Sequence, residues 1–279
     1  VWSRGEPFTL PVSEKYIGYV KALKGKTRKC IVVDLDNTLW GGVIGEDGME
    51  GIRLSQNGEG REFFDFQKLL RSFAQRGVLL AVNSKNNPDD ALKVIREHPS
   101  MFLREGHFCS IKINWNNKVM NMEEIAAELN IGLDSMVFID DDPVNREMIS
   151  KNLPGVLVID LPKDPSQYTP TLTTLNDFNL LKITQDDINR GKMYLQERKR
   201  KDFHGSATNL EEFFKQLNIK IKIKNADKFT IPRMSQLTLK TNQFNLTTKR
   251  YQEEEIRQIA ENNNWLVGCA QVEDKFGDN

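Results

Sequence analysis

The stretch Ile31-Val32-Val33-Asp34-Leu35-Asp36 constrains this chain of 279 residues more than any other, because an apolar run ends there at two carboxylates. A short β-branched run predicts a fully buried strand of a parallel sheet. Such sheets bind ligands outside the carboxyl ends of their strands, which is where Asp34 and Asp36 fall. Two carboxylates this close repel each other unless a cation or a shared proton neutralises one, so the pattern indicates a divalent metal such as Mg2+.

The same stretch suggests a chemistry. Asp34 could attack a phosphorus atom while Asp36 handles the proton of the leaving group. An isolated D-x-D-x-T pattern is equally compatible with an Asp-rich turn in which Asn37 and Thr38 cap the next segment. The choice depends on whether other strands supply the remaining groups of a phosphoryl-transfer site.

Three further apolar runs supply these groups. The run 78–83 predicts a second buried strand that ends at Ser84, whose hydroxyl can bind a phosphoryl oxygen. The segment 110–115 leads to Lys118, whose charge can stabilise a pentavalent transition state. The run 136–139 ends at Asp140-Asp141-Asp142, and three adjacent carboxylates at the end of a buried strand indicate a bound cation. These groups therefore favour a phosphoryl-transfer site over an Asp-rich turn at Asp34 and Asp36.

Helical patterns at 59–75, 88–98 and 122–129 alternate with these strands through short loops. This alternation predicts a doubly wound, three-layer α/β domain with a parallel sheet. The aromatic residues of the first helix have helical spacing, so we expect them in the core rather than around a cofactor.

The expected domain organisation has three parts. Residues 1–27 form a flanking helix that begins at Ser13 and packs on the sheet, and residues 28–165 form the α/β domain. Prolines mark a change of texture near the end of that domain. Residues 166–279 then predict a helical linker and a smaller α+β subdomain, whose strand at 219–223 alternates and so has one buried face.

Composition limits the class of protein. The 39 basic residues balance the 39 acidic residues, which gives no indication of a nucleic-acid or membrane partner. No apolar run approaches the ~20 residues that span a bilayer, and no signal peptide opens the chain. The three cysteines are too sparse for a disulfide framework or a zinc site. We expect a soluble, cytoplasmic domain of a longer polypeptide.

Strands that end in Asp34, Ser84, Lys118 and the Asp140-Asp141 pair, in this order, resemble the four motifs of the haloacid dehalogenase (HAD) superfamily. The resemblance covers roughly residues 28–160. Within that superfamily the segments 34–48, 114–118, 137–141 and 236–246 resemble the FkbH-like branch. Proteins of that branch take the glyceryl group of 1,3-bisphosphoglycerate, remove phosphate and leave D-glycerate as a thioester on an acyl carrier protein.

The resemblance implies roles for particular residues. Asp34 is the nucleophile and Asp36 is the general acid and then the general base, while Ser84 and Lys118 bind the phosphoryl oxygens. The implied Mg2+ ligands are Asp34, the carbonyl of Asp36 and Asp141. Asp140 is the rival of Asp141, which we favour because Asn145 follows it by four residues. The predicted substrate-binding residues are Thr38, Trp40, Gly41, Gly42, Asn86 and Asn242.

The glycine-rich stretch 41–48 has two compatible interpretations. Its backbone could approach a ligand closely, or it could form a tight hairpin of two short strands. The basic run Arg198–Lys201 also has two interpretations. It is either the solvated face of a polar helix over 186–201 or a docking surface for an acidic carrier protein.

The acyl-transfer half of the implied reaction needs a sulfur nucleophile. It is either the phosphopantetheine thiol of the carrier or a cysteine of this chain that acts as a relay. Cys30 and Cys109 lie at the far ends of their predicted strands, which favours core positions. Cys269 lies in the last strand of the C-terminal subdomain, which resembles an incomplete N-acetyltransferase fold.

The leading hypothesis is a glyceryl transferase and phosphatase that primes polyketide biosynthesis on a carrier protein. The first alternative is a plain Mg2+-dependent phosphatase of a small phosphorylated metabolite or a protein, which would not need residues 200–279. The second is an adaptor that has lost its activity and only docks a carrier. The intact set of Asp34, Asp36, Ser84, Lys118 and Asp141 argues against the adaptor.

Overall fold

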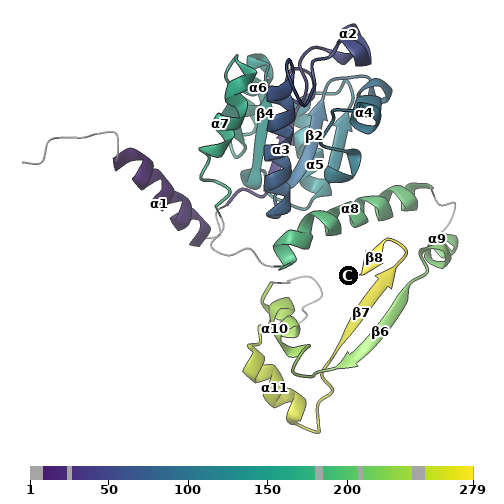
Figure 1. Cartoon of the computed structure of the whole chain (residues 1–279). Coiled ribbons are helices and arrows are strands. Elements are labelled where there is room, and N and C mark those ends of the chain that lie inside the picture. The colour runs from purple at the N-terminus through teal and green to yellow at the C-terminus, as the bar shows by residue number, and fades with distance from the viewer. Residues whose placement is uncertain (1–8, 24–26, 180–184, 207–209, 241–248, 279) are drawn as a thin grey trace, which may run out of the picture. The chain divides into compact units, whose positions relative to one another are not determined.

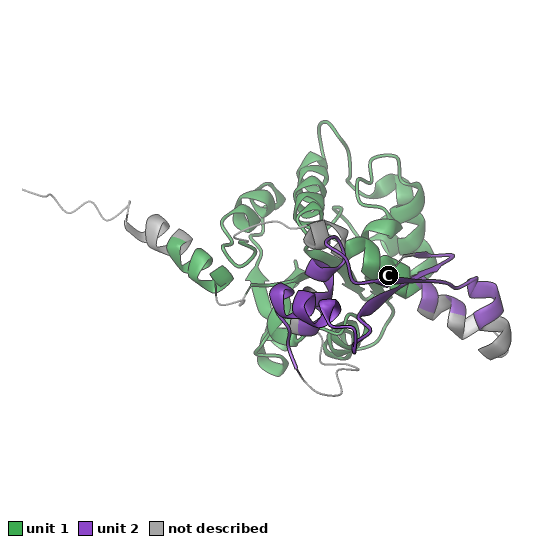
Figure 2. Ribbon diagram, turned by 90° about the horizontal axis from the view of Figure 1, so that it is seen from below, with its two compact units in different colours: residues 1–198 green, residues 199–279 purple. Residues whose placement is uncertain are grey.

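The computed structural model describes residues 9–23, 27–179, 185–206, 210–240 and 249–278 (Figure 1). The chain divides into two compact units, residues 1–198 and 199–279 (Figure 2). None of the helices in the described ranges is long and apolar enough to cross a membrane.

The first unit is built on a five-stranded parallel sheet with the order β3-β2-β1-β4-β5. Its strands are β1 (Cys30–Val33), β2 (Leu79–Ser84), β3 (Ser110–Ile113), β4 (Met136–Asp140) and β5 (Leu157–Asp160). Val33 of β1 lies opposite Val82 on one side and Ile139 on the other. The carboxyl ends of β1, β2 and β4 therefore meet at one edge, and the predicted α/β fold is confirmed.

Alternating side chains of the strands enter two separate cores. In β1, Ile31 and Val33 pack into one core while Cys30 and Val32 pack into the other. The first core is covered by α3 (Arg61–Gln75), α4 (Pro88–Glu97) and α7 (Tyr168–Thr173). The second is covered by α5 (Lys118–Glu128), by α6 (Pro143–Asn152) and by Tyr194 and Leu195 of α8 (Gln185–Ser206). The sheet is thus buried on both faces, as parallel sheets usually are.

The aromatic residues of α3 lie in the core, as predicted. Phe63, Phe66 and Phe73 are buried together with Leu70 on one face of this helix. Burial of each such side chain stabilises the fold by roughly 1.5–3 kcal/mol. Gly77, at φ 92°, follows the end of the helix in the left-handed conformation that glycine adopts without strain.

Two local predictions near the carboxyl edge were wrong. Helix α5 begins at Lys118 rather than at Met122, because the side chain of Asn117 caps it by accepting a hydrogen bond from the Val119 N–H at 2.9 Å. The glycine-rich stretch forms the short helix α2 (Ile44–Gly51) rather than a hairpin. A single β-bridge between Gly41 and Arg53 closes this excursion.

The N-terminal helix also differs from its prediction. Helix α1 (Thr9–Leu23) begins before Ser13, and Tyr16 and Leu23 are 68% and 70% exposed, so its apolar face does not pack on the sheet. The helix instead contacts the segment 176–179, where Lys21 Nζ pairs with Asp177 Oδ1 at 2.7 Å and Gly18 packs against Asn176 and Asn179.

The boundary between the two units falls after Arg198 instead of at residue 165. Tyr168, Leu172 and Phe178 lie in the first core, so the segment expected to be a linker packs on the α/β unit. A proline-rich change of texture therefore does not mark a domain boundary in this chain.

The second unit contains α9 (Leu210–Leu217), β6 (Lys220–Asn225), α10 (Ile231–Lys240), α11 (Glu253–Glu261), β7 (Gly268–Asp274) and β8 (Gly277–Asp278). Its strands form an antiparallel sheet in the order β6-β7-β8, consistent with the expected α+β character. All residues of β6 are exposed, including Ile221 and Ile223, so the buried face predicted for this strand is not covered within the described residues. The similarity to an N-acetyltransferase fold stays a prediction.

Candidate active site

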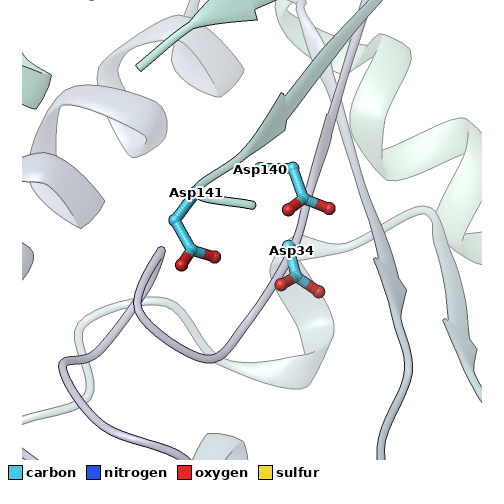
Figure 3. A group of neighbouring side chains, drawn as sticks. All are labelled: Asp34, Asp140 and Asp141. Carbon is cyan, nitrogen blue, oxygen red and sulfur yellow. The ribbon is translucent and has the colours of Figure 1, made fainter. Parts of the chain in front are cut away.

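Three carboxylates converge at the carboxyl edge of the parallel sheet (Figure 3). Asp34 directly follows β1, Asp140 is the last residue of β4, and Asp141 is next in the chain. Each offers an oxygen, and these oxygens lie within 4.8 Å of one another. Asp142 does not join them, because its side chain caps α6 by accepting a hydrogen bond from the Val144 N–H at 2.9 Å.

Among the described residues, one buried lysine faces this cluster. Lys118 Nζ lies 2.6 Å from Asp140 Oδ2 and 2.9 Å from Asp34 Oδ1, and Lys118 is only 1% exposed. Burial lowers the pKa of Lys118, but the charges of Asp34 and Asp140 raise it by more, so the amine stays charged. One cation faces three carboxylates, and this excess of negative charge suits a hard divalent cation with oxygen ligands. Apart from its ion pair, Asp34 Oδ1 has no hydrogen-bond partner among the described residues.

The excess of negative charge is clearest in the pKa of Asp141. Burial raises its pKa to about 6, and the neighbouring charges of Asp34 and Asp140 contribute to the increase. A carboxyl group that resists ionisation beside two others is stabilised in its charged form when a cation binds.

The raised pKa of Asp141 predicts a pH dependence of stability in the metal-free protein. The unfolded chain loses this proton near its ordinary pKa of 3.8, whereas the folded chain keeps it to about 6. The folded state binds more protons between these values, so the contribution of Asp141 to the free energy of unfolding falls as the pH rises through this window. We expect thermal unfolding in EDTA to show a smaller decrease over this window in Asp141→Asn than in the wild type. Equal decreases in the variant and the wild type would contradict a raised pKa of Asp141 in the folded protein.

The carboxylate of Asp36 is held by three N–H donors. Oδ1 accepts hydrogen bonds from Trp40 Nε1 at 2.8 Å and from the Ile44 N–H at 3.1 Å, and Oδ2 accepts one from Asn86 Nδ2 at 2.8 Å. Trp40 is fully buried, so its visible role is to orient Asp36. The substrate contacts predicted for Trp40 and Asn86, and the metal contact of the Asp36 carbonyl, stay predictions.

The loop that follows Asp36 is closed by its own hydrogen bonds. The Gly42 N–H donates to Asn37 Oδ1 at 2.9 Å, and Asn37 and Gly42 have positive φ values of 52° and 95°. A Cβ at Gly42 would also collide with the Asp47 carboxylate, so this position requires glycine. Gly41 and Thr38 are buried, and Thr38 Oγ1 has no hydrogen-bond partner among the described residues. Their predicted substrate contacts are not tested by this geometry.

Ser84 lies where the sequence placed it, at the end of β2 beside β1. It is 1% exposed, and its carbonyl accepts a hydrogen bond from the Asn114 N–H at 3.1 Å. Its contact with a phosphoryl oxygen remains a prediction.

The reason given for preferring Asp141 over Asp140 was wrong. Asn145 Nδ2 donates to Asp140 Oδ1 at 3.3 Å, so Asn145 supports Asp140. Sequence reasoning also missed Arg146, whose Nη1 donates to the carbonyl oxygens of Asp140 at 2.9 Å and Asp141 at 2.6 Å. Its Nη2 pairs with Asp160 of β5 at 2.9 Å. The guanidinium holds the turn that carries both carboxylates, and no local motif indicates this role.

Tyr168 is a second residue that sequence reasoning missed. Its hydroxyl donates to the Asn37 carbonyl at 3.1 Å, although the two residues are 131 positions apart. Burial raises the pKa of Tyr168 to about 12, so the phenol remains a hydrogen-bond donor at neutral pH.

We expect Tyr168→Phe to lower the free energy of unfolding by about 1 kcal/mol, the usual contribution of one hydrogen bond. The change keeps the ring, which packs edge-on against Phe63 and Phe66, so only the support of Asn37 is lost. Urea unfolding measures this effect. No change would show that water replaces the phenol at the Asn37 carbonyl.

Two of the three candidate relay cysteines are poor nucleophiles here. Burial raises the pKa of Cys109 to about 11 and the pKa of Cys30 well above its usual range, so both thiols stay protonated at neutral pH. Cys30 lies at the amino end of β1, the end opposite the acidic cluster. Cys269 lies in β7 of the second unit.

Two other predictions can be placed only in part. Asn242 lies outside the described residues. In the basic run, Arg198 Nη1 donates to the Phe108 carbonyl, and Arg200 pairs with Asp274 of its own unit at 2.5 Å. The run is therefore not a uniformly solvated basic face.

The chain was compared with protein-family models, curated proteins and solved structures. Neither protein-family models nor curated proteins produced a match. The chain is similar to the N-terminal part of the protein BF1531 from Bacteroides fragilis, which contains a phosphatase domain and was crystallised in complex with Mg, with 42% identity and a TM-score of 0.59. The alignment covers 61% of this chain and 46% of that one. An uncharacterised protein from Corynebacterium glutamicum aligns at 14% identity with a TM-score of 0.36, over 55% of this chain and 97% of that one.

Proposed function

We propose that this chain is a Mg2+-dependent phosphohydrolase of the HAD type, with Asp34 as its nucleophile. One observation carries the proposal: Asp34 lies at the carboxyl edge of the sheet beside a buried lysine and two further carboxylates. The similarity to a phosphatase domain that binds Mg supports both the reaction and the metal.

Each residue of the site has its own role in the proposed reaction. Asp34, Asp140 and Asp141 would hold Mg2+, which would offset the negative charge of the phosphoryl group. Asp34 attacks the phosphorus, and the bond to the leaving oxygen breaks as Asp36 donates a proton to that oxygen. Asp36 then accepts a proton from water, which attacks the aspartyl phosphate, releases phosphate and restores Asp34. Lys118 and Ser84 bind the phosphoryl oxygens.

We further propose that the natural reaction loads a glyceryl group onto an acyl carrier protein, as the FkbH-like resemblance implies. The phosphopantetheine thiolate of the carrier attacks the acyl phosphate of 1,3-bisphosphoglycerate, so that a C–S bond forms and the C–O bond to phosphate breaks. The phosphatase site removes the 3-phosphate. The raised pKa values of Cys30 and Cys109 favour direct attack by the thiol of the carrier over a relay through either residue.

Intact masses of both proteins test the phosphatase activity and the loading of the carrier separately. The protein is incubated with Mg2+, 1,3-bisphosphoglycerate and a phosphopantetheinylated carrier protein. We expect a glyceryl adduct on the carrier together with release of phosphate. Release of phosphate without an adduct on either protein would leave a plain phosphatase of a small metabolite, and an adduct on this chain that one Cys→Ala variant removes would identify a relay. No release of phosphate from any phosphoester would overturn the proposal.

A further inference from the structure

Three asparagine side chains join the segments that carry Ser84 and Lys118. Asn83 Nδ2 donates to the Lys118 carbonyl at 2.9 Å. Asn121 Nδ2 donates to Asn83 Oδ1 and to Asn114 Oδ1, both at 3.0 Å, and Asn114 Nδ2 donates back to Asn121 Oδ1 at 3.3 Å. The amide network thus consists of Asn83 at the end of β2, Asn114 in the loop after β3 and Asn121 in the first turns of α5.

The network borders the second core, where apolar side chains could pack in place of the buried amides. Asn83 and Asn121 are both 0% exposed. In β2, Asn83 continues the row of Leu79 and Ala81, which pack into the second core under α5. A buried amide costs free energy unless it is hydrogen-bonded, and an apolar pair of the same shape can be as stable as a satisfied polar pair. Stability alone therefore does not explain three amides here.

Hydrogen bonds differ from apolar contacts in being directional. The bonds of Asn83 and Asn121 determine how far the first turn of α5 can slide or rotate over β2. Lys118 is the first residue of that helix, and its Nζ lies 2.9 Å from Asp34, which follows β1, and 2.6 Å from Asp140, which ends β4. Asn83 directly precedes Ser84 in β2, and the backbone N–H of Asn114 donates to the Ser84 carbonyl, so the network is also anchored beside Ser84.

We propose that Asn83, Asn114 and Asn121 are positioning residues that place Lys118 and Ser84 for phosphoryl transfer. This inference rests on the proposed phosphatase function. The side chains of these asparagines act through the two groups that they orient. A displacement of about 1 Å at such groups can cost on the order of 10²-fold in rate.

The double variant Asn83→Leu/Asn121→Leu separates positioning from stability. Leucine has the branched shape of asparagine, and changing both residues removes both members of the buried Asn83–Asn121 bond; the Asn114 amide, which loses its partner Asn121, is only half-buried. We expect a thermal unfolding midpoint close to that of the wild type, and a kcat for a small phosphoester reduced by roughly 10–100-fold with KM changed less. A stable double variant with the wild-type kcat would overturn the proposal.

Two further variants keep the test decisive. Ser110→Ala is the matched control, because Ser110 is buried and bonds Glu128 at the other end of the β3–α5 pair; it should leave kcat unchanged. If the double variant does not fold, Asn114→Ala decides, since Asn114 is only half-buried. It should lower kcat at least threefold, a smaller loss than the roughly 10–100-fold expected for the double variant, and an unchanged kcat would overturn the proposal.

A binding measurement distinguishes failure of this inference from failure of the proposed function. Tungstate, a phosphate analogue, is titrated calorimetrically into the wild type and into each variant. If the wild type hydrolyses no phosphoester, the proposed function fails, and weaker tungstate binding by the asparagine variants would still support positioning of Lys118 and Ser84. Equal binding by all folded variants would then overturn the positioning role.

Discussion

Asp34→Asn is expected to abolish release of phosphate, with kcat/KM reduced by at least about 10⁴-fold, as losses of a catalytic nucleophile typically are. The amide of asparagine cannot form the acyl phosphate, and the change also removes one oxygen ligand of the acidic cluster. The fold should persist, because Lys118 keeps Asp140 as its partner at 2.6 Å. Continuous phosphate release with a small phosphoester and Mg2+ measures the loss.

The matched control for Asp34→Asn is Asp142→Asn. Asp142 is the neighbour of the acidic cluster in sequence, but its side chain caps α6, and asparagine caps a helix as well as aspartate does. This variant should retain near wild-type activity. If Asp34→Asn kept substantial activity while folded, Asp34 would not be the nucleophile, and the proposed mechanism would have to be abandoned.

Lys118→Met is expected to give the largest loss of stability, roughly 3–5 kcal/mol in the free energy of unfolding of the metal-free protein. Lys118 is buried and pairs with two buried carboxylates, and methionine leaves both without a cation. Added Mg2+ should restore part of the loss, because a bound dication offsets the same charges. Urea unfolding in EDTA and in Mg2+ measures both effects.

Lys112→Met provides the comparison for Lys118→Met. Lys112 pairs with Glu124 and Glu128, whose side chains are 49% and 41% exposed, so its removal should cost only ~1 kcal/mol or less. Equal losses for the two variants would show that the ion pairs of Lys118 contribute no more than surface pairs. A Lys118→Met protein that Mg2+ does not stabilise would argue against a cation at the acidic cluster.

Residues next to strand ends were predictable because their signal is local. A β-branched run followed by carboxylates predicts a buried strand and a polar edge, and the parallel topology then brings such edges together. Asp34, Ser84 and Asp140-Asp141 were located in this way. Lys118 was found by its motif, but the helix that carries it was expected to begin at Met122, since the capping role of Asn117 was not recognised.

The supporting residues of the site were not predictable, because they act through contacts between distant segments. Tyr168 reaches Asn37 across 131 positions, and Asn121 meets Asn83 across 38 positions. In the sequence, each of these side chains looks like an ordinary polar residue of a helix or strand. Its partner is known only from the packed structure.

The sequence by itself determined the parallel α/β unit and the carboxylates, serine and lysine at its edge, because strand periodicity and residue chemistry are written in short segments. Only the tertiary structure decided that Asp36 is held by Trp40 and Asn86, and that the first unit continues to Arg198. It also decided that Asn145 supports Asp140. These outcomes depend on which buried polar groups find partners once distant segments pack, and local sequence patterns do not encode that pairing.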